Sequence, residues 1–503
     1  MIAAVSGASG PVEKVGLVAL LAACGGLLIA LERPRPRALL AAFVVAVAPA
    51  LLLVDVWHSA ALSSLRNHPL RGALAGVVVV GAAAALALLL HRSPNLFAPL
   101  ALLVLPFRLP IASGGTVANL LVPLYVVVGG ATVGLLIRPP AGFGKEPRGR
   151  PLRLALAGYL LLYGLQALYS ADFPKALQTA TFFDAPFALL FAVLALLRWE
   201  RKTVERTFSV LIGLACVLVA VGFAEYARGR LFLNPRLIAD NTYTSFFRVN
   251  SLFFDPNVFG RFLAIAIVVA TVALYAARRQ KLAIALAAAI LFLWGGLLTT
   301  YSQSSMIALL VGLAVIVAYR YDPPSALAGL ALVGVIGLMV LLLAPASARF
   351  GLFEKEGSAN GATSGRVGLL SGGLRLFAKR PLVGFGSGSF ATEFRRQESQ
   401  ASGAVASHTT PVTVAAEQGL IGLLAYLALV ASSLWLLVKE AGRSPPKLAL
   451  LAAYAALLVH TLGYADFLED PTSWFLLGAA VGLAALGRRE APPLPAAAKT
   501  TAS

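Results

Sequence analysis

The sequence predicts an all-α, polytopic integral membrane protein with about 12–15 transmembrane helices. Hydrophobic residues make up 59% of the 503 residues and charged residues only 13%, whereas soluble domains carry about 45–50% apolar and about 25% charged residues. The apolar residues also come in blocks long enough to cross a bilayer, which takes roughly 17–25 residues. Because a segment in lipid must satisfy its own backbone hydrogen bonds, we expect these blocks to be helices.

Fifteen apolar blocks are candidate spans. The fourth block contains Pro106, Arg108 and Pro110, which disfavour a continuous helix in lipid. The first block could instead be peripheral to the membrane. In chain order the blocks are 15–31, 38–54, 72–90, 95–112, 116–137, 153–169, 183–197, 207–226, 257–277, 282–300, 305–319, 326–344, 416–438, 448–464 and 472–487.

Lys and Arg are concentrated in alternate short loops, and this pattern orients the chain. Because cytoplasmic loops keep Lys and Arg, we expect their side, the C-terminus included, to be cytoplasmic. We expect one transmembrane domain over 1–487 and a disordered cytoplasmic tail over 488–503. The basic segments are 32–37, 138–153, 198–206, 278–281, 439–447 and 488–490. The main remaining loops, which should face outward, are 55–71, 170–182, 227–256, 345–415 and 465–471.

The formal net charge of +19 is divided among these loops rather than gathered in one stripe. Membrane topology therefore explains it better than a nucleic-acid surface, and no nucleic-acid partner is expected. Cys24 and Cys216 both lie in apolar blocks, and the sequence has no CxxC, HExxH or DxD motif. No metal site and no cofactor are predicted. The acidic DFLEDP segment at 466–471 could hold a cation or form a solvated turn.

The outward loop 345–415 is much longer than a connector requires, which favours a functional role. Within it, residues 364–380 predict an amphipathic helix that begins at Ser364, ends before Pro381 and lies along the membrane surface. The following GFGSGSF (384–390) predicts a flexible turn and lacks the ending of a phosphate-binding P-loop. One face of the helix carries Val367, Leu370, Leu374 and Phe377, and another carries Ser371, Arg375 and Lys379.

Apart from Arg108, the middles of the candidate spans contain no Asp, Glu, Lys or Arg. Ion-coupled transporters generally keep ionisable groups near the bilayer midplane. Here Glu225, Arg261 and Glu417 lie near the outer ends of their blocks. The pattern favours chemistry at the outer membrane face and makes a transporter or flippase the alternative.

Arginines in two outward segments could clamp a diphosphate. Arg248 and Asn257 belong to FFRVNSLFFDPNVFGRF (246–262), and Arg366 belongs to SGRVGLL. A guanidinium stays charged and can bind two oxygens at once, which suits a pyrophosphate at headgroup level. The alternative for each arginine is contact with lipid phosphates. For Arg261 we expect a structural role, either reaching outward to the interface or capping the 227–256 loop.

His408 lies where the long loop re-enters an apolar block. Thr409 or Thr410 can cap a helix that starts with Pro411. The helix macrodipole would then disfavour an imidazolium, and a neutral imidazole can act as a general base. The alternative is a loop histidine bonded to nearby backbone. His58, His68, His91 and His460 are poorer candidates because they lack a partner motif, face the cytoplasm or lie in an apolar block.

Four stretches resemble motifs of the O-antigen ligase and O-antigen polymerase family of bacterial envelope glycosyltransferases. They run from about residue 240 to 440, in the family's order, with a large outward loop among them. The first has an Arg before a small-Phe-x-x-Pro-Asn run, and the third joins a Gly-Arg helix to a Pro-Leu-x-Gly-x-Gly turn. The stretches are RVNSLFFDPNVFGRFLA, YSQSSMIALLVG, SGRVGLLSGGLRLFAKRPLVGFGSGSF and SHTTPVTVAAEQGLIGLLAYLAL.

The resemblance implies a GT-C-like helical fold and inverting, metal-independent transfer from a polyprenyl-diphosphate-linked glycan at the outer face of the bacterial plasma membrane. The family's paired arginines bind the donor diphosphate and its histidine activates the acceptor, which implies these roles for Arg248, Arg366 and His408. Thr409, Thr410 and Pro411 depart from the family's pattern after the histidine, and no Arg accompanies Ser304 and Ser305.

These features lead to one hypothesis. The protein transfers a glycan from a polyprenyl diphosphate to a saccharide, lipid-linked or protein hydroxyl, in contact with membrane lipids. His408 acts as the base, while Arg248 and Arg366 hold the leaving pyrophosphate. The secondary candidates are Arg261, Arg375, Lys379, Asn257 and Glu417. The alternative is a membrane transporter or flippase of lipid-linked saccharides.

Overall fold

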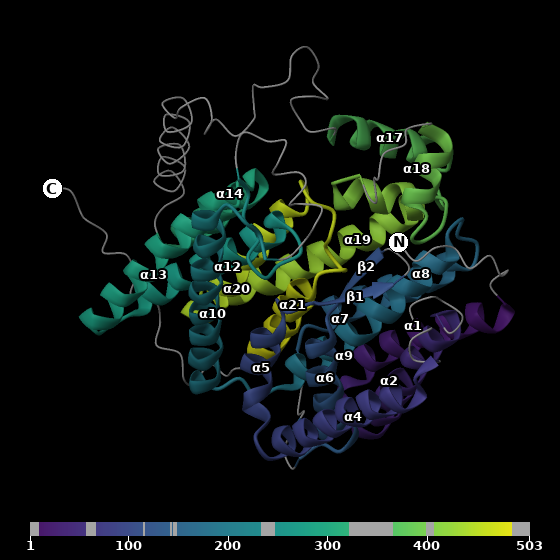
Figure 1. Cartoon of the computed structure of the whole chain (residues 1–503), viewed down its shortest axis with the longest axis horizontal. Coiled ribbons are helices and arrows are strands. Elements are labelled where there is room, and N and C mark those ends of the chain that lie inside the picture. The colour runs from purple at the N-terminus through teal and green to yellow at the C-terminus, as the bar shows by residue number, and fades with distance from the viewer. Residues whose placement is uncertain are drawn as a thin grey trace. The chain divides into compact units, whose positions relative to one another are not determined.

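The protein is almost entirely helical in the computed structural model (Figure 1). The structure describes residues 10–56, 67–113, 116–140, 143, 148–232, 247–320, 366–398 and 407–484. In this part of the chain nine helices are long and apolar enough to cross a membrane, and four more apolar helices are shorter. The predicted all-α polytopic class is thereby confirmed. The total of 12–15 spans stays a prediction, since block 326–344 lies outside the described residues.

The chain divides into two compact units, each built from separate stretches of sequence. Unit 1 comprises the described residues of Met1–Thr203, Leu369–Ser433 and Ala465–Leu486. Unit 2 comprises those of Val204–Gly368, Leu434–Tyr464 and Gly487–Ser503. The single transmembrane domain over 1–487 stays a prediction. The tail 488–503 lies outside the described residues.

Unit 1 is a helical assembly with one short hairpin. Its principal packed pairs are α1 with α7, α9 with α21, α1 with α2, and α4 with α6. Every residue of α9 except Pro186 is buried, which makes this helix the centre of the unit. The elements are α1 (Pro11–Ile29), η1 (Ala30–Glu32), α2 (Pro34–Val56), α4 (Pro69–Arg92), η3 (Pro94–Leu96), α5 (Phe97–Val104), β1 (Leu109–Ser113), β2 (Thr116–Leu120), α6 (Val122–Ala131), η4 (Thr132–Ile137), α7 (Arg150–Ala167), α8 (Phe173–Thr179), η5 (Ala180–Asp184), α9 (Ala185–Leu196), most of α17 (Arg366–Lys379), α18 (Phe390–Glu398), the first part of α19 (Thr410–Ala441) and α21 (Pro471–Ala484).

Unit 2 is built around α12 (Pro256–Ala276), which packs on three other helices. Nearly all of α12 up to Ala270 is buried. By contrast, α13 exposes Leu282, Ile284 and Leu291, which suits contact with lipid tails. The unit also contains most of α10 (Arg201–Arg228), α13 (Gln280–Thr299), α14 (Gln303–Arg320), the end of α19 and α20 (Pro445–His460).

The predicted span at 95–112 is wrong. The helix there, α5, ends at Val104, and β1 pairs antiparallel with β2 in the register Leu109 opposite Leu120. Pro106 explains the stop, because proline has no backbone N–H and clashes with the preceding helical turn. The predicted span at 116–137 is shortened, because its first residues form β2 of this hairpin.

The predicted outward loop at 170–182 is also wrong for most of its length. Helix α8 starts at Phe173 and continues through η5 and α9, so one apolar helix runs over Phe173–Leu196. Asp172 caps it by accepting from Lys175 N at 3.2 Å, and Pro174 occupies the first turn. Asp184 therefore lies near the middle of a span. The prediction that, apart from Arg108, the middles of the spans contain no charged residue is wrong at this position.

Candidate active site

The candidate residues of unit 2 begin at the start of α12. Asp255 caps this helix, its Oδ1 accepting from Asn257 N at 2.6 Å, and Pro256 fills the first position. Gly260, one turn later, allows α14 to approach, since a Cβ at Gly260 would lie 2.7 Å from Ser305 Oγ. The DPN sequence and this glycine thus bring the first turn of α12 against the start of α14.

Arg248 lies against that junction, half-buried in the extended segment before α12. Its Nε donates to Thr300 O at 3.1 Å and its Nη2 donates to Asn257 Oδ1 at 3.3 Å. Its neighbour Val249 donates its N–H to Thr299 O at 3.1 Å. The Nε and Nη2 groups of Arg248, which donate in different directions, therefore fix the plane of the guanidinium.

The segment between α13 and α14 supplies the other side of this cluster. Tyr301 takes a left-handed φ of 50° there, and burial together with nearby Tyr226 raises the pKa of its phenol. The hydroxyl of Ser302 donates to Asn257 Oδ1 at 2.9 Å and lies 2.7 Å from Ser305 Oγ. The tight turn thus delivers Thr300 O and the Ser302 hydroxyl to the Arg248–Asn257 pair.

Two further charged residues of unit 2 support the structure near this cluster. Glu225 is fully buried, and its carboxylate accepts from Phe232 N and Ser251 N, both at 2.9 Å. It thereby fixes the turn at Ser251, which has a φ of 51°. Arg261, one of the secondary candidates, is only 2% exposed within α12 and does not reach outward to an exposed surface.

In unit 1 the predicted flexible turn at 384–390 is a packed, hydrogen-bonded structure. Gly384, Gly386 and Gly388 have φ values of 65°, 97° and 78°. Gly386 N donates to Glu417 O at 2.7 Å, and Ser387 Oγ donates to Tyr163 O at 2.9 Å. Glycine is required for these positive φ values and close contacts, not for flexibility.

Replacing Gly386 with alanine should destabilise the protein by about 2–5 kcal/mol, because a left-handed residue gains a Cβ that overlaps the backbone of Ser170. The measurement is the Tm of the purified protein in detergent. Gly229→Ala is the matched control, since Gly229 has a φ of 59° but nothing within 4 Å of the added Cβ. Equal Tm changes in the two variants would contradict the packed-turn description.

Glu417 anchors the helix that follows this turn. Its two carboxylate oxygens accept from Gly388 N at 2.8 Å and from Phe390 N at 3.0 Å, at the start of α18. An anion at a helix N-terminus satisfies free N–H groups and interacts favourably with the macrodipole. Thr392 of α18 also donates to Asp172 Oδ2 at 2.6 Å. Glu417 thus holds α18 in place, whatever other role it has.

Glu417→Gln should loosen α18 without unfolding the rest of unit 1. The amide NH₂ cannot accept a hydrogen bond, so one buried N–H loses its partner at a cost of about 1–3 kcal/mol. Hydrogen exchange of the α18 amides should then accelerate about 5–100-fold. Arg395→Ala on the exposed face of α18 is the control. Unchanged exchange in Glu417→Gln would show that the carboxylate does not hold the helix.

Helix α19 is broken at Gly419, whose φ and ψ are 65° and −163°. The break releases the next N–H groups from their own helix. Leu420 N donates to Pro381 O at 2.7 Å and Ile421 N donates to Leu382 O at 3.3 Å. The segment after α17 therefore occupies the place of the missing helical turn.

His408 lies in a tight turn just before α19 and has a left-handed φ of 61°. The turn is closed by Ser407, whose Oγ donates to Thr409 O at 2.8 Å and lies 2.9 Å from Thr413 Oγ1. The helix starts at Thr410, within one residue of the predicted start. The buried Thr410 hydroxyl makes no hydrogen bond within the described residues, so Thr410 does not supply the predicted cap.

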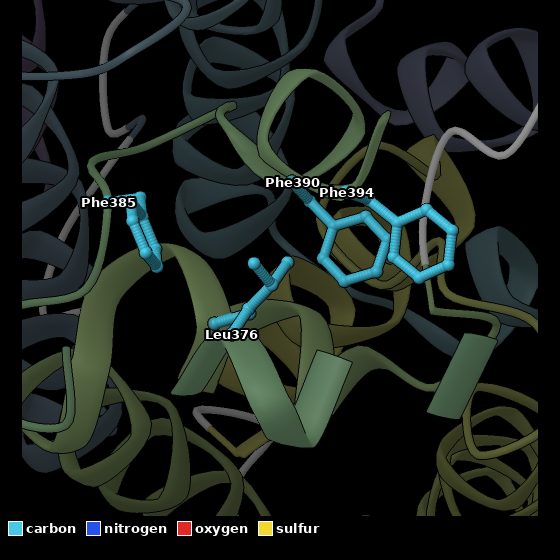
Figure 2. Close-up of a cluster of buried hydrophobic side chains, with 5 residues drawn as sticks. Leu376, Phe385, Phe390 and Phe394 are labelled. Atoms are coloured by element: carbon cyan, nitrogen blue, oxygen red, sulfur yellow. The ribbon is translucent and has the colours of Figure 1, made fainter. Parts of the chain in front are cut away.

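Helix α17 packs on α18 (Figures 1 and 2) and on the turn that contains His408. A Cβ at Gly373 would lie 2.7 Å from Val412 and 3.4 Å from Ser407 Cβ, so the helix axis passes close to that turn. Figure 2 shows Phe390 and Phe394 side by side, with centroids 5.6 Å apart. The buried cluster consists of Leu376, Phe385, Phe390, Phe394 and Ala416.

The remaining side of α17 is exposed. Leu370 and Leu374, which the amphipathic pattern assigns to a membrane-facing stripe, are 37% and 49% exposed. Arg375 is exposed, and Lys379 Nζ donates to Gln397 Oε1 of α18 at 2.5 Å. Arg366 begins the helix, and its side chain lies outside the described part of the structure.

The structure thus brings together two sets of candidates. Arg248 and Asn257 form one hydrogen-bonded cluster in unit 2. His408, Glu417, Arg375 and Lys379 belong to the α17–α18–α19 region of unit 1. Whether Arg248, Arg366 and His408 meet around one substrate stays a prediction.

His460, a poorer candidate by sequence because it lies in an apolar block, is fully buried with its Nε2 3.3 Å from Ser304 Oγ. The serine-rich YSQSS stretch was a signal for a polar partner in an apolar block, but it did not identify which one. In the acidic segment, Asp470 accepts from Thr472 N at 2.9 Å and caps α21, in keeping with a turn.

Comparison with known proteins agrees with the motif order. The sequence profile of the O-antigen ligase family matches residues 287–427. The matched range includes the serine-rich start of α14, all of α17 and α18, and His408; Arg248 and His460 lie outside it. No curated protein matches the chain. Residues 287–427 are therefore similar to the O-antigen ligase family, and the resemblance drawn from the motifs is confirmed over this range.

Proposed function

We propose that the protein transfers a glycan from a polyprenyl-diphosphate carrier to an acceptor hydroxyl at the outer face of the bacterial plasma membrane. The O-antigen ligase domain supports glycosyl transfer of the ligase or polymerase type in general. The lysine- and arginine-rich loops support an extracytoplasmic site and a cytoplasmic C-terminus. The acceptor is a saccharide, a lipid-linked saccharide or a protein hydroxyl, and the transfer inverts the anomeric carbon without a metal ion.

One observation carries the proposal: within the family domain, His408 is held in a closed turn beside α17, the helix that begins with Arg366. A base must be fixed within hydrogen-bonding reach of the proton that it removes. The Ser407–Thr413 contact and the packing of Gly373 restrict the backbone turn that carries the imidazole. A histidine in a loose surface loop would lack this preorganisation.

In the proposed reaction, the acceptor oxygen attacks the anomeric carbon from the side opposite the diphosphate. The new carbon–oxygen bond forms as the bond to the phosphate oxygen breaks, and the hydroxyl proton passes to His408. Arg248 and Arg366 stabilise the charge on the departing polyprenyl diphosphate. Arg375, Lys379 and Arg261 are secondary sources of positive charge.

The test is reconstitution of the full chain in vesicles with a polyprenyl-diphosphate-linked glycan and a series of acceptor hydroxyls. The expected result is a new glycosidic bond together with one released polyprenyl diphosphate per transfer. Product detection by mass spectrometry identifies the acceptor. If the donor stays intact with every acceptor, the proposal is wrong.

Asp184 favours a second candidate, a transporter or flippase of lipid-linked saccharides. Its side chain is 3% exposed, lies mid-span, and its Oδ2 makes no hydrogen bond within the described residues. It is also the last residue of a π-helical segment, η5, a feature often found at functional sites. In the same vesicles this function would move the intact donor to the opposite leaflet and form no glycosidic bond.

A further inference from the structure

A continuous chain of hydrogen-bonding groups runs from Arg248 into the buried part of unit 2. Ser302, the next group after Asn257, lies 3.3 Å from Ser304 Oγ, and Ser304 Oγ lies 3.3 Å from His460 Nε2. Ser302 and His460 are fully buried, and Ser304 is 8% exposed. The groups come from α12, from the start of α14 and from the end of α20, which pack on one another.

Counting protons fixes the direction of the hydrogen bonds from Arg248 and Ser302 to Asn257. A guanidinium has donors only, so the atom of Asn257 that faces Arg248 must be its oxygen. The single hydroxyl proton of Ser302 is donated to the same oxygen. With that proton used, Ser302 can accept from Ser304 as well as from Ser305, and Ser304 can then accept from the tautomer of His460 that carries its hydrogen on Nε2.

This order fixes the orientation of the Asn257 side chain. Its Oδ1 accepts from Arg248 Nη2 and from Ser302 Oγ. The amide NH₂ is then on the other branch of the carboxamide. Asn257 is half-buried, and its Nδ2 makes no hydrogen bond within the described residues. Arg248 and Asn257, which are in direct contact, thus offer two kinds of donor, a cation and a neutral amide.

We infer that Asn257 is a second phosphate-binding residue, donating its amide NH₂ to the diphosphate held by Arg248, and that His460 is a positioning residue that fixes this amide through Ser304 and Ser302. The inference rests on the proposed function, which supplies the diphosphate. A neutral amide beside a permanent cation adds a directional hydrogen bond to a charge contact. Buried hydrogen-bond networks hold side chains in one geometry.

The test uses the purified full chain and farnesyl diphosphate as a soluble probe, with Kd from calorimetry and Tm measured in parallel. Asn257→Asp keeps an oxygen facing Arg248 and Ser302 but replaces the NH₂ donor with a second oxygen. We expect Kd to rise about tenfold or more while Tm holds or increases. Because the new carboxylate also repels the diphosphate, Asn257→Leu, which removes the NH₂ without adding a charge, is measured beside it and should raise Kd to a similar extent. A residue with only a structural role would lower Tm in Asn257→Leu but leave Kd unchanged.

His460 is tested by a conservative and a non-conservative change. Glutamine can place an N–H near the position of Nε2, whereas leucine cannot donate at all. We expect His460→Leu to raise Kd about tenfold and His460→Gln to raise it less than about threefold. Thr461→Ala is the control, since the buried Thr461 hydroxyl donates within its own helix to Leu458 O at 2.6 Å.

The outcomes separate the two proposals. If wild type does not bind the diphosphate, the proposed function is wrong. If Arg248→Lys weakens binding but Asn257→Asp does not, Asn257 is not a phosphate ligand and the inference fails alone. Equal Kd values for His460→Leu and His460→Gln would remove His460 from the chain. Non-additive losses in Asn257→Asp combined with His460→Leu would support a single coupled unit.

Discussion

Replacing His408 with asparagine is expected to lower the rate of glycan transfer about 10²–10⁴-fold, the usual contribution of a general base. Asparagine is the sharpest substitution because it tolerates the left-handed φ of 61° at this position and keeps a polar side chain. The Ser407–Thr413 closure of the turn should therefore remain. The measurement is the initial rate of glycosidic bond formation in vesicles at saturating donor.

The control for this variant is His68→Asn, which changes an exposed histidine just before α4. Its transfer rate should equal that of wild type. The Tm of both variants should stay within a few degrees of wild type, so that a lost rate reports on chemistry. Transfer by His408→Asn at a rate near that of wild type would rule out His408 as the base.

Arg248→Lys should lower kcat/KM for the donor about 10–100-fold although the positive charge is kept. The guanidinium uses Nε for Thr300 O and Nη2 for Asn257, and a lysine ammonium cannot reproduce this planar pair of contacts. Arg248→Ala should be worse, because the departing diphosphate then also loses a charge partner. The measurement is the donor dependence of transfer at fixed acceptor concentration.

Arg228→Lys provides the comparison, because Arg228 lies at the exposed end of α10 in the same unit. It should leave kcat/KM unchanged. An equal, small effect of Arg248→Lys and Arg228→Lys would mean that Arg248 contacts only lipid headgroups.

Capping residues and prolines in the sequence predicted many helix boundaries. The DPN at 255–257 gave the start of α12, and the helix predicted at 364–380 is α17 over Arg366–Lys379. The errors arose where a proline or a capping residue placed the end of a helix away from the end of the apolar block. Pro106 ended α5 early and left a hairpin, whereas Asp172 and Pro174 started a helix ten residues before the apolar block did. Hydropathy alone does not give the helix ends in either region. Capping residues give the helix start at Asp172 and Pro174, but not the hairpin after Pro106.

The candidate site divides in the same way. Arg248 and Asn257 are close in sequence, at the two ends of RVNSLFFDPN, so their proximity could be predicted. His460 could not be connected to Ser304, because the contact joins residues 156 positions apart and the flanking LLVHTLG contains nothing specific to such a partner. The anchoring role of Glu417 was hidden for a related reason, since its partners are backbone N–H groups, which every sequence contains.

The interruption of α19 at Gly419 also bears on how the lipid environment affects the α17–α18 part of unit 1. A long hydrophobic helix answers a thicker or thinner bilayer by tilting. After Gly419 in the sequence, the first amides of the apolar part of α19 donate hydrogen bonds to the carbonyls of Pro381 and Leu382, not to the turn that follows His408. A change in the tilt of the apolar part of α19 should therefore first displace the C-terminal end of α17. The length of the lipid acyl chains would then affect the distance between that end of α17 and the imidazole of His408.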